Sequence, residues 1–196
     1  TKRDFEGFAF DYQYSFYQSK NDAGILELSR EAGFELPEDD VTDGFSTDVS
    51  IMIGANAADG RGNVTLYGGY REIDPVLSGF RDTNNCALGG SSPENWSCGG
   101  SQTVPEGNFT DFGVLTPNSF DFIVDGDQFV PRDGLLYNYQ PPNHLQRPDE
   151  RVTVGALGYY TFNDAFEVYA EVSYMDDKSV AQIAPSGAFF VTNSLS

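Results

Sequence analysis

The sequence predicts an all-β protein organised around an antiparallel up-and-down meander of about five long strands. Three observations predict it. Apolar and polar residues alternate along several segments of about ten residues, the pattern of a strand with one apolar face. The 196 residues include 21 glycines and 10 prolines, which disfavours long helices. The connections between the alternating segments are long and short in turn.

The first expected strand covers about residues 5–18 and carries a ladder of aromatic rings. Every second residue from 8 to 16 is aromatic, and the residues between them are small or polar. One face of this strand is therefore apolar and the other hydrophilic. The rings of the ladder are those of Phe8, Phe10, Tyr12, Tyr14 and Phe16.

The other four strands form two hairpins. They are expected at about residues 46–56, 63–73, 151–162 and 165–177. The first hairpin turns at Asp59-Gly60, a strong tight-turn signal, and the second turns at Asn163-Asp164. Each of these strands also keeps one apolar face, which on the last strand includes Val168 and Val172.

The long connections all fall on one side of the meander. They cover residues 19–45, 74–150 and 178–196, whereas the two intervening turns are short. Long loops on one side and short turns on the other are typical of a transmembrane β-barrel whose long loops are extracellular. A soluble β-sandwich also alternates, but its loops rarely segregate by length in this way.

The charge distribution agrees with a barrel. The chain has 30 acidic and 11 basic side chains, a net charge of −19, which argues against a nucleic-acid partner. Residues 19–45 and 74–150 hold 19 of the 30 acids, whereas the apolar strand faces carry no charge. A charged side chain that faces lipid costs about 2–4 kcal/mol at the middle of a bilayer.

Five strands are too few to close a barrel, which needs about eight. Two open strand edges in lipid would leave backbone groups without hydrogen-bond partners. We therefore expect the chain to supply part of a larger barrel. The start at Thr1-Lys2-Arg3-Asp4, with neither an initiator methionine nor a signal peptide, agrees with a processed chain or a piece of a longer one.

Two cysteines, Cys86 and Cys98, lie in a glycine- and serine-rich stretch. No histidine or third cysteine is near enough in the sequence to complete a zinc site. A single local disulfide and an oxidising compartment are the favoured interpretation, and two free thiols in a reducing cytosol are the alternative. Closing so short a loop stabilises the fold by about 3 kcal/mol.

The sequence offers no catalytic constellation, so we expect neither an enzyme nor a cofactor. His144 is the sole histidine and lies in a proline-rich loop. Glu167 and Glu171 share a strand face, but about 13 Å separates their Cα atoms, which is wide for a glycosidase pair. Asp121, Asp125 and Asp127 suggest calcium, although turn and solvation roles explain them better and no metal site is expected.

Several residues are candidates for functional contacts. The hydrophilic strand faces should line the barrel interior, where they meet lumen water, other protein groups or a solute; these candidates are Arg71, Glu167, Tyr169 and Glu171. Aromatic residues of the longest loop are candidates for substrate contact, namely Trp96, Tyr137 and Tyr139. Residues 120–130 should form a small hairpin within that loop, and residues 24–33 form either a short helix or two bent extended pieces.

Four segments resemble TonB-dependent receptors. The opening Thr1-Lys2-Arg3-Asp4-Phe5-Glu6-Gly7 resembles the junction between the plug and the first barrel strand. The others are residues 53–63, with Ile53-Gly54-Ala55-Asn56 and Asp59-Gly60-Arg61-Gly62-Asn63, residues 146–151, and residues 169–177. The likeness covers most of the chain and rests on these segments in order.

The resemblance implies a 22-stranded outer-membrane barrel closed by an N-terminal plug domain. It implies uptake of a scarce small-molecule solute, such as a siderophore, metal complex or carbohydrate, energised by the TonB complex through the plug. The chain would supply the first five strands and would lack the plug. The alternative is a secreted soluble β-sandwich that binds carbohydrate through its aromatic residues.

Overall fold

The computed structural model describes residues 4–92, 95–115 and 117–189. The chain divides into two units. The sheet unit comprises Thr1–Ser19, Val41–Val76 and His144–Ala181, and the loop unit comprises Lys20–Asp40, Leu77–Asn143 and Gln182–Ser196. Residues 1–3, which open the resembling junction, and residues 190–196 of the last expected loop lie outside the described residues.

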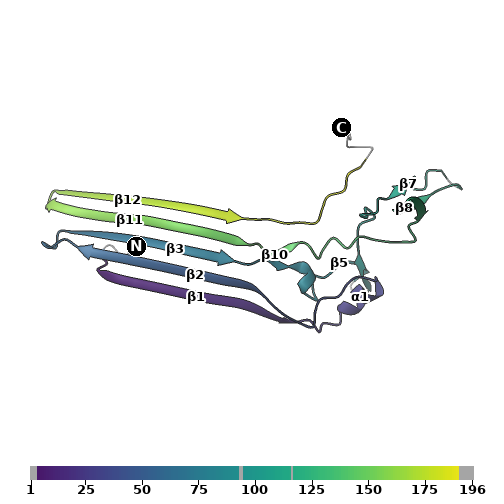
Figure 1. The fold of residues 1–196 in the computed structure, drawn as a ribbon, viewed down its shortest axis with the longest axis horizontal. Helices are drawn as coiled ribbons and strands as arrows, with labels where there is room; N and C mark the ends of the chain where they lie inside the picture. The colour runs from purple at the N-terminus through teal and green to yellow at the C-terminus, as the bar shows by residue number, and fades with distance from the viewer. Residues whose placement is uncertain (1–3, 93–94, 116, 190–196) are drawn as a thin grey trace. The chain divides into compact units, whose positions relative to one another are not determined.

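The sheet unit confirms the expected all-β class. A five-stranded antiparallel sheet has the order β1-β2-β3-β11-β12, so each long strand lies beside its neighbour in the chain (Figure 1). The strands are β1 (Gly7–Lys20), β2 (Asp40–Asn56), β3 (Gly62–Ile73), β11 (Asp149–Asn163) and β12 (Phe166–Ser179). The described residues contain no helix long and apolar enough to cross a membrane.

The largest difference from the expected boundaries is at the start of β2. The alternation places this start near residue 46, whereas the strand begins at Asp40. Gly44 is the reason, because it interrupts the apolar pattern with a backbone φ of 60°. A Cβ atom at this position would lie 2.6 Å from the Tyr17 ring and from a methyl group of Val76, so the close approach also requires glycine.

The register places the apolar side chains of neighbouring strands on one face. Ile51 pairs with Gly68, Gly68 with Val154, and Val154 with Tyr174, so these residues form one row across β2, β3, β11 and β12. Phe45 of β2 joins the ring ladder of β1 to this face, because its ring centroid is 6.2 Å from that of Tyr14. We call this surface the apolar face.

The apolar face is exposed. Phe8 retains 66% of its accessible surface and Val172 retains 70%, and the other rings of the ladder are also exposed. Val168 and Val172 lie on this face by register, opposite Tyr160 and Ala156 of β11. No second sheet covers the ladder in the described parts of the chain.

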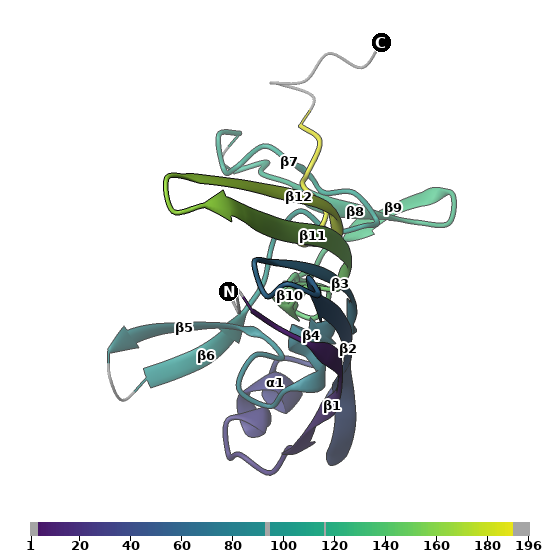
Figure 2. The same cartoon turned by 90° about the vertical axis from the view of Figure 1, so that its left-hand side faces the viewer.

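A short N-terminal segment, residues 4–6, crosses the opposite, polar face; we call it the strap. The Asn63 side chain donates hydrogen bonds to the Phe5 carbonyl oxygen over 2.8 Å and to Asn56 over 2.7 Å. The Tyr159 hydroxyl donates to Asp4 of the strap. Asn63 and Tyr159 are paired across β3 and β11, so the strap spans adjacent strands. Figure 2 shows the sheet as a curved layer.

The loop unit consists of short elements. They are α1 (Leu26–Glu31), the 3-10 helix η1 (Ser78–Phe80), β5 (Ala87–Ser92), β6 (Asn95–Gly99), β7 (Phe109–Thr110), β8 (Asp121–Asp125) and β9 (Gln128–Pro131). Two further short strands, β4 (Val76–Leu77) and β10 (His144–Gln146), pair with each other. The hairpin expected near residues 120–130 is confirmed by β8 and β9, and α1 decides between the two alternatives for residues 24–33.

A substitution at Gly54 tests how closely the strap packs against β2. A Cβ atom at Gly54 would lie 2.1 Å from the Phe5 carbonyl oxygen. Gly54→Ala should therefore displace the strap and reduce the free energy of unfolding by about 1–3 kcal/mol, measured by denaturant titration. Gly68→Ala is the matched control, because its nearest atom would be 3.7 Å away. Equal stability of the two variants would contradict the strap.

Candidate functional site

A row of charged side chains crosses the polar face of the sheet. Asp48 of β2 pairs with Arg71 of β3, Arg71 with Arg151 of β11, and Arg151 with Asp177 of β12. Arg151 donates from Nε to the Asp177 carboxylate over 2.5 Å. Among the described residues, Arg71 has no ion pair, although Asp48 and Arg151 are its direct cross-strand neighbours.

A hollow of about 520 Å³ opens beside this row. Its charged lining combines two guanidinium groups with two carboxylates, and Met52 and Tyr67 contribute apolar surface. The lining includes Asp11, Asp48, Met52, Tyr67, Arg71 and Arg151. The Tyr67 ring is accommodated because residue 155 is a glycine, where a Cβ atom would lie 2.2 Å from the ring. The hollow can therefore contact a solute or a protein segment that carries both positively and negatively charged groups.

The expected interior-facing residues share the polar face but do not form one cluster. Glu171 lies opposite Leu157, and Tyr169 lies opposite Tyr159, in rows nearer the turn than the row of Arg71. Glu167 accepts a hydrogen bond from the Thr161 hydroxyl over 2.9 Å. Whether these side chains line a solute path stays a prediction.

In the loop unit, Asn21 connects three segments that are distant in the sequence. Its amide group donates to the carbonyl oxygens of Glu38 and Phe80, and its side-chain oxygen accepts from the Asp82 backbone N–H over 3.0 Å. Asn21 is 3% exposed. Because its buried side chain is satisfied on both ends, it fixes the first long loop against the second.

The disulfide between Cys86 and Cys98 is confirmed. It joins the two ends of the β5–β6 hairpin, and the Ser29 hydroxyl of α1 lies 3.3 Å from the Cys98 sulfur. Trp96, a candidate for substrate contact, is exposed on β6. The second candidate, Tyr137, pairs through its backbone with Ser101.

The third candidate, Tyr139, is partly exposed, and its backbone carbonyl oxygen accepts a hydrogen bond from the Asn143 side chain over 3.0 Å. A substrate role for the three aromatic residues stays a prediction.

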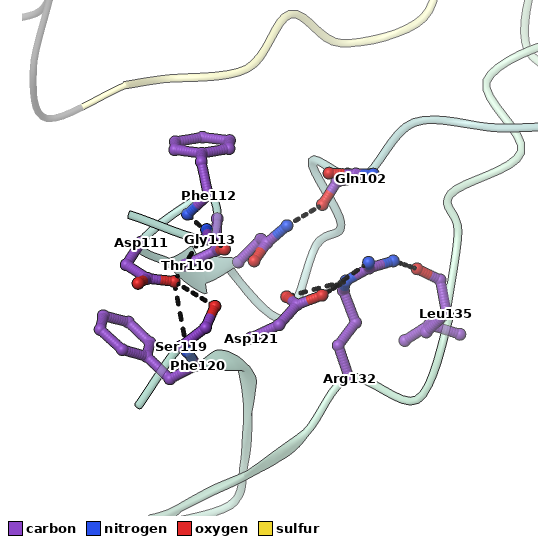
Figure 3. Close-up of polar contacts among 11 residues, drawn as sticks. Gln102, Thr110, Asp111, Phe112, Gly113, Ser119, Phe120, Asp121, Arg132 and Leu135 are labelled. Atoms are coloured by element: carbon purple, nitrogen blue, oxygen red, sulfur yellow. Dashed lines mark hydrogen bonds and ion pairs between the residues drawn. The ribbon is translucent and has the colours of Figure 1, made fainter. Parts of the chain in front are cut away.

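The segment between β7 and β8, residues 111–120, is organised around Asp111, and we call it the Asp111 loop (Figure 3). The Asp111 carboxylate accepts from the backbone N–H groups of Gly113, Leu115 and Phe120 and from the Ser119 hydroxyl, over 2.6–3.2 Å. Partial desolvation raises the pKa of Asp111, but these four hydrogen bonds outweigh it and lower the pKa to about 2. The loop is thus built on a carboxylate that is ionised at neutral pH.

Asp121 is occupied by an arginine rather than available to a cation. Arg132 donates from Nε to both carboxylate oxygens over 3.0 Å and from Nη2 over 2.7 Å, which lowers the pKa of Asp121. Arg132 also donates to the Leu135 carbonyl oxygen (Figure 3). Asp125 and Asp127 flank the β8–β9 turn at Gly126, whose φ is 60°. The described residues contain no group of three potential metal ligands.

Sequence reasoning did not single out Asn21, Asp111 or Arg132. Asp111-Phe112-Gly113 carries a turn signal, an aspartate two residues before a glycine, which could have indicated the loop. Asn21 and Arg132 carry no such local signal, because the partners of Asn21 and the carboxylate partner of Arg132 lie beyond the local sequence.

No protein-family model, no curated protein and no solved structure matches this chain.

Asn21→Ala should destabilise the loop unit by about 3 kcal/mol, because it removes three side-chain hydrogen bonds and leaves three partly buried backbone groups without these partners. Hydrogen exchange at the Asp82 amide should accelerate, since Asn21 accepts its hydrogen bond. Asn118→Ala, at an exposed position of the same unit, is the control and should leave both measurements unchanged. Slow exchange at Asp82 in Asn21→Ala would refute this role.

The Asp111 loop should be acid-sensitive. The pKa of Asp111 is about 2 in the folded loop and 3.8 for an unperturbed carboxyl, so its stabilisation is complete above about pH 5 and is lost as the pH falls through about 2. An NMR titration of the carboxyl carbon should give a midpoint near 2, with coincident shifts at the amides of Gly113, Leu115 and Phe120. A midpoint near 3.8 would show that the four hydrogen bonds do not form.

Proposed function

We propose that the chain supplies part of a transmembrane β-barrel in a bacterial outer membrane, and that the barrel belongs to a TonB-dependent receptor that takes up a scarce solute. The first half of this proposal rests on the sheet, and the second half on the resemblance of the segments quoted above. The observation that carries it is the exposed apolar face, which spans five strands and carries no charge along its middle.

The amount and arrangement of exposed apolar surface favour lipid as its partner. Soluble proteins rarely expose contiguous apolar patches of more than a few hundred Å². Here the rings of β1 and the valines of β12 are exposed at opposite ends of one sheet. Register joins β2 to β12, and the contact between the Phe45 and Tyr14 rings adds β1. A hydrocarbon environment accepts this surface without a second protein layer.

A carbohydrate-binding β-sandwich is the second candidate. In a sandwich the apolar faces of two sheets pack against each other at about 10 Å, which would bury the ring ladder of β1. The exposure of Phe8 and its neighbours in the described structure therefore favours the barrel.

The edges of the sheet support a larger barrel. β1 and β12 are the outer strands, so each presents one row of backbone groups to whatever lies beside it. In lipid those groups need hydrogen-bond partners from further strands, because no water is present to replace them. We propose that further strands of the same barrel pair with both edges and close it.

The polar face would then line the lumen. It carries the row of Arg71 and Arg151 with their carboxylate neighbours, and the strap crosses it. In a receptor of this family the plug occupies the lumen, so the strap would lie where the plug joins the first strand. The plug and the TonB complex that acts through it are the proposed protein partners.

The loops would form a wet, negatively charged rim. Residues 19–45 and 74–150 carry most of the acids of the chain, so their field favours cationic or metal-bearing solutes over free anions. Neutral carbohydrates and peptides remain compatible with this rim. Capture by the loops would precede plug-gated passage, and the proposed activity is transport rather than catalysis.

Lysine substitution on the two faces of β1 tests the membrane assignment. Tyr12→Lys places a charge on the apolar face and should cost about 2–4 kcal/mol in lipid, which reduces the folded fraction in outer membranes. The measurement is the heat-modifiable electrophoretic mobility of the full-length protein in isolated membranes.

Gln13→Lys is the matched control, because it adds the same charge on the polar face, where the Gln13 side chain bonds to Asp11. It should fold and insert normally. Normal insertion of Tyr12→Lys would count against the barrel, and a soluble, carbohydrate-binding product would favour the sandwich.

A further inference from the structure

Gly69 leaves space in the floor of the hollow on the polar face. It lies on β3 between Tyr67 and Arg71, which share its face, and it pairs with Ser50 of β2 and Thr153 of β11. A Cβ atom at Gly69 would meet its nearest atoms at 3.5 and 3.9 Å, which is ordinary van der Waals contact. Its φ is not positive. Neither packing nor backbone geometry requires a glycine here, so its effect is to keep the hollow open.

Four charged side chains line the hollow, and two of them have partners within the sheet. Arg151 donates to the Asp177 carboxylate, and Asp11 accepts a hydrogen bond from the Gln13 side chain over 3.0 Å. These two groups are less available to a ligand, because the ligand would have to displace a partner that the chain itself supplies.

The other two charged side chains, Asp48 and Arg71, make no hydrogen bond or ion pair with the described residues. They lie directly opposite each other on β2 and β3. Residues so placed have Cβ atoms about 4.5–5.5 Å apart, near enough for opposite charges to pair. Here they do not pair with each other, so the hollow offers one unpaired cation beside one unpaired anion.

This pair of charges selects the ligand. A simple anion is attracted by Arg71 but repelled by Asp48 and Asp11, and a simple cation meets the converse. A ligand that satisfies both unpaired groups carries an anion and a cation close together. A short peptide with free termini does so, because its carboxylate accepts two parallel hydrogen bonds from a guanidinium group and its ammonium group donates to a carboxylate.

The size and the apolar lining of the hollow agree with such a ligand. Its volume of about 520 Å³ lies within the range of about 300–1,000 Å³ that is typical of small-molecule sites. Met52 and Tyr67 line it beside the charges and offer apolar surface to a peptide side chain.

We propose that the hollow binds short zwitterionic peptides, with the peptide carboxylate on Arg71, the peptide ammonium group on Asp48 and an apolar side chain against Met52 and Tyr67. The binding site stands on the sheet alone. That such peptides are a transported substrate rests on the proposed receptor function.

The test is isothermal titration calorimetry of the full-length protein with three probes. They are the dipeptide leucylleucine, its N-acetyl derivative, which lacks the ammonium group, and its C-terminal amide, which lacks the carboxylate. Each derivative should bind about tenfold more weakly than leucylleucine, because it leaves one charge of the hollow without a partner. Raising the salt concentration should weaken binding of leucylleucine.

Two variants assign each end of the peptide to its partner. Arg71→Gln should weaken leucylleucine about tenfold and should no longer distinguish it from the amide. Asp48→Asn should likewise no longer distinguish it from the N-acetyl derivative. Loss of the same discrimination in both variants, or equal binding of the three probes to the wild-type protein, would overturn the proposal.

Gly69→Val tests the space in the hollow. The added side chain fills the floor and should abolish binding of leucylleucine. Gly68→Val is the matched control, because it adds the same side chain to the apolar face, and it should keep wild-type affinity. Wild-type affinity in a folded Gly69→Val protein would refute the site, and the two charge variants decide if this variant does not fold.

The outcome for the site is separable from that for the membrane assignment. Binding of leucylleucine by a protein that does not insert into membranes would keep the site and reject the barrel. Normal insertion together with equal, weak binding of all three probes would reject the site and keep the barrel.

Discussion

The cross-strand register of the five-stranded sheet is the constraint on which the other features depend. Side chains alternate between the two faces of a strand, so a shift of one residue between neighbours would exchange the faces. With Ile51 opposite Gly68 and Gly68 opposite Val154, all charges in the middle of the sheet fall on the polar face. The same register lines up Asn56, Asn63 and Tyr159 in one row, and this row receives the strap. The apolar surface, the charged row and the strap are thus consequences of one hydrogen-bonded ladder.

The loop unit is stabilised differently, because few of its apolar side chains are buried. Its buried apolar side chains among the described residues are Cys86, Cys98 and Val104. Single polar groups with several partners take over the role of a core: Asn21 joins three segments, and Asp111 closes its own loop. The disulfide reduces the entropy of the unfolded chain, although by no more than about 3 kcal/mol for so short a loop. Such a unit is specified by a small number of buried hydrogen bonds, each of which costs free energy when one partner is removed.

The sheet was largely predictable because its signal is local and repeated. Alternation alone indicates the five strands and the shared face of Val168 and Val172, and the spacing of the two cysteines indicates their disulfide. The start of β2 was not predictable, since Gly44 interrupts the alternation and the strand continues through it. The hydrogen-bonding role of Asn21 in the loop unit was not predictable for another reason. The partners of Asn21 are 17, 59 and 61 residues away, and no local pattern encodes which backbone groups a buried amide will meet.

The strap has a kinetic consequence. Its partners lie on three strands, and the contact between Asp4 and Tyr159 spans 155 residues of sequence. Contacts of such long sequence separation form late, because the loop they close is long and the strands that carry them must already be paired. We therefore expect residues 4–6 to be among the last of the described residues to reach their native position, although they come first in the chain. The strap can form all of its contacts only after β2, β3 and β11 have paired in the correct register.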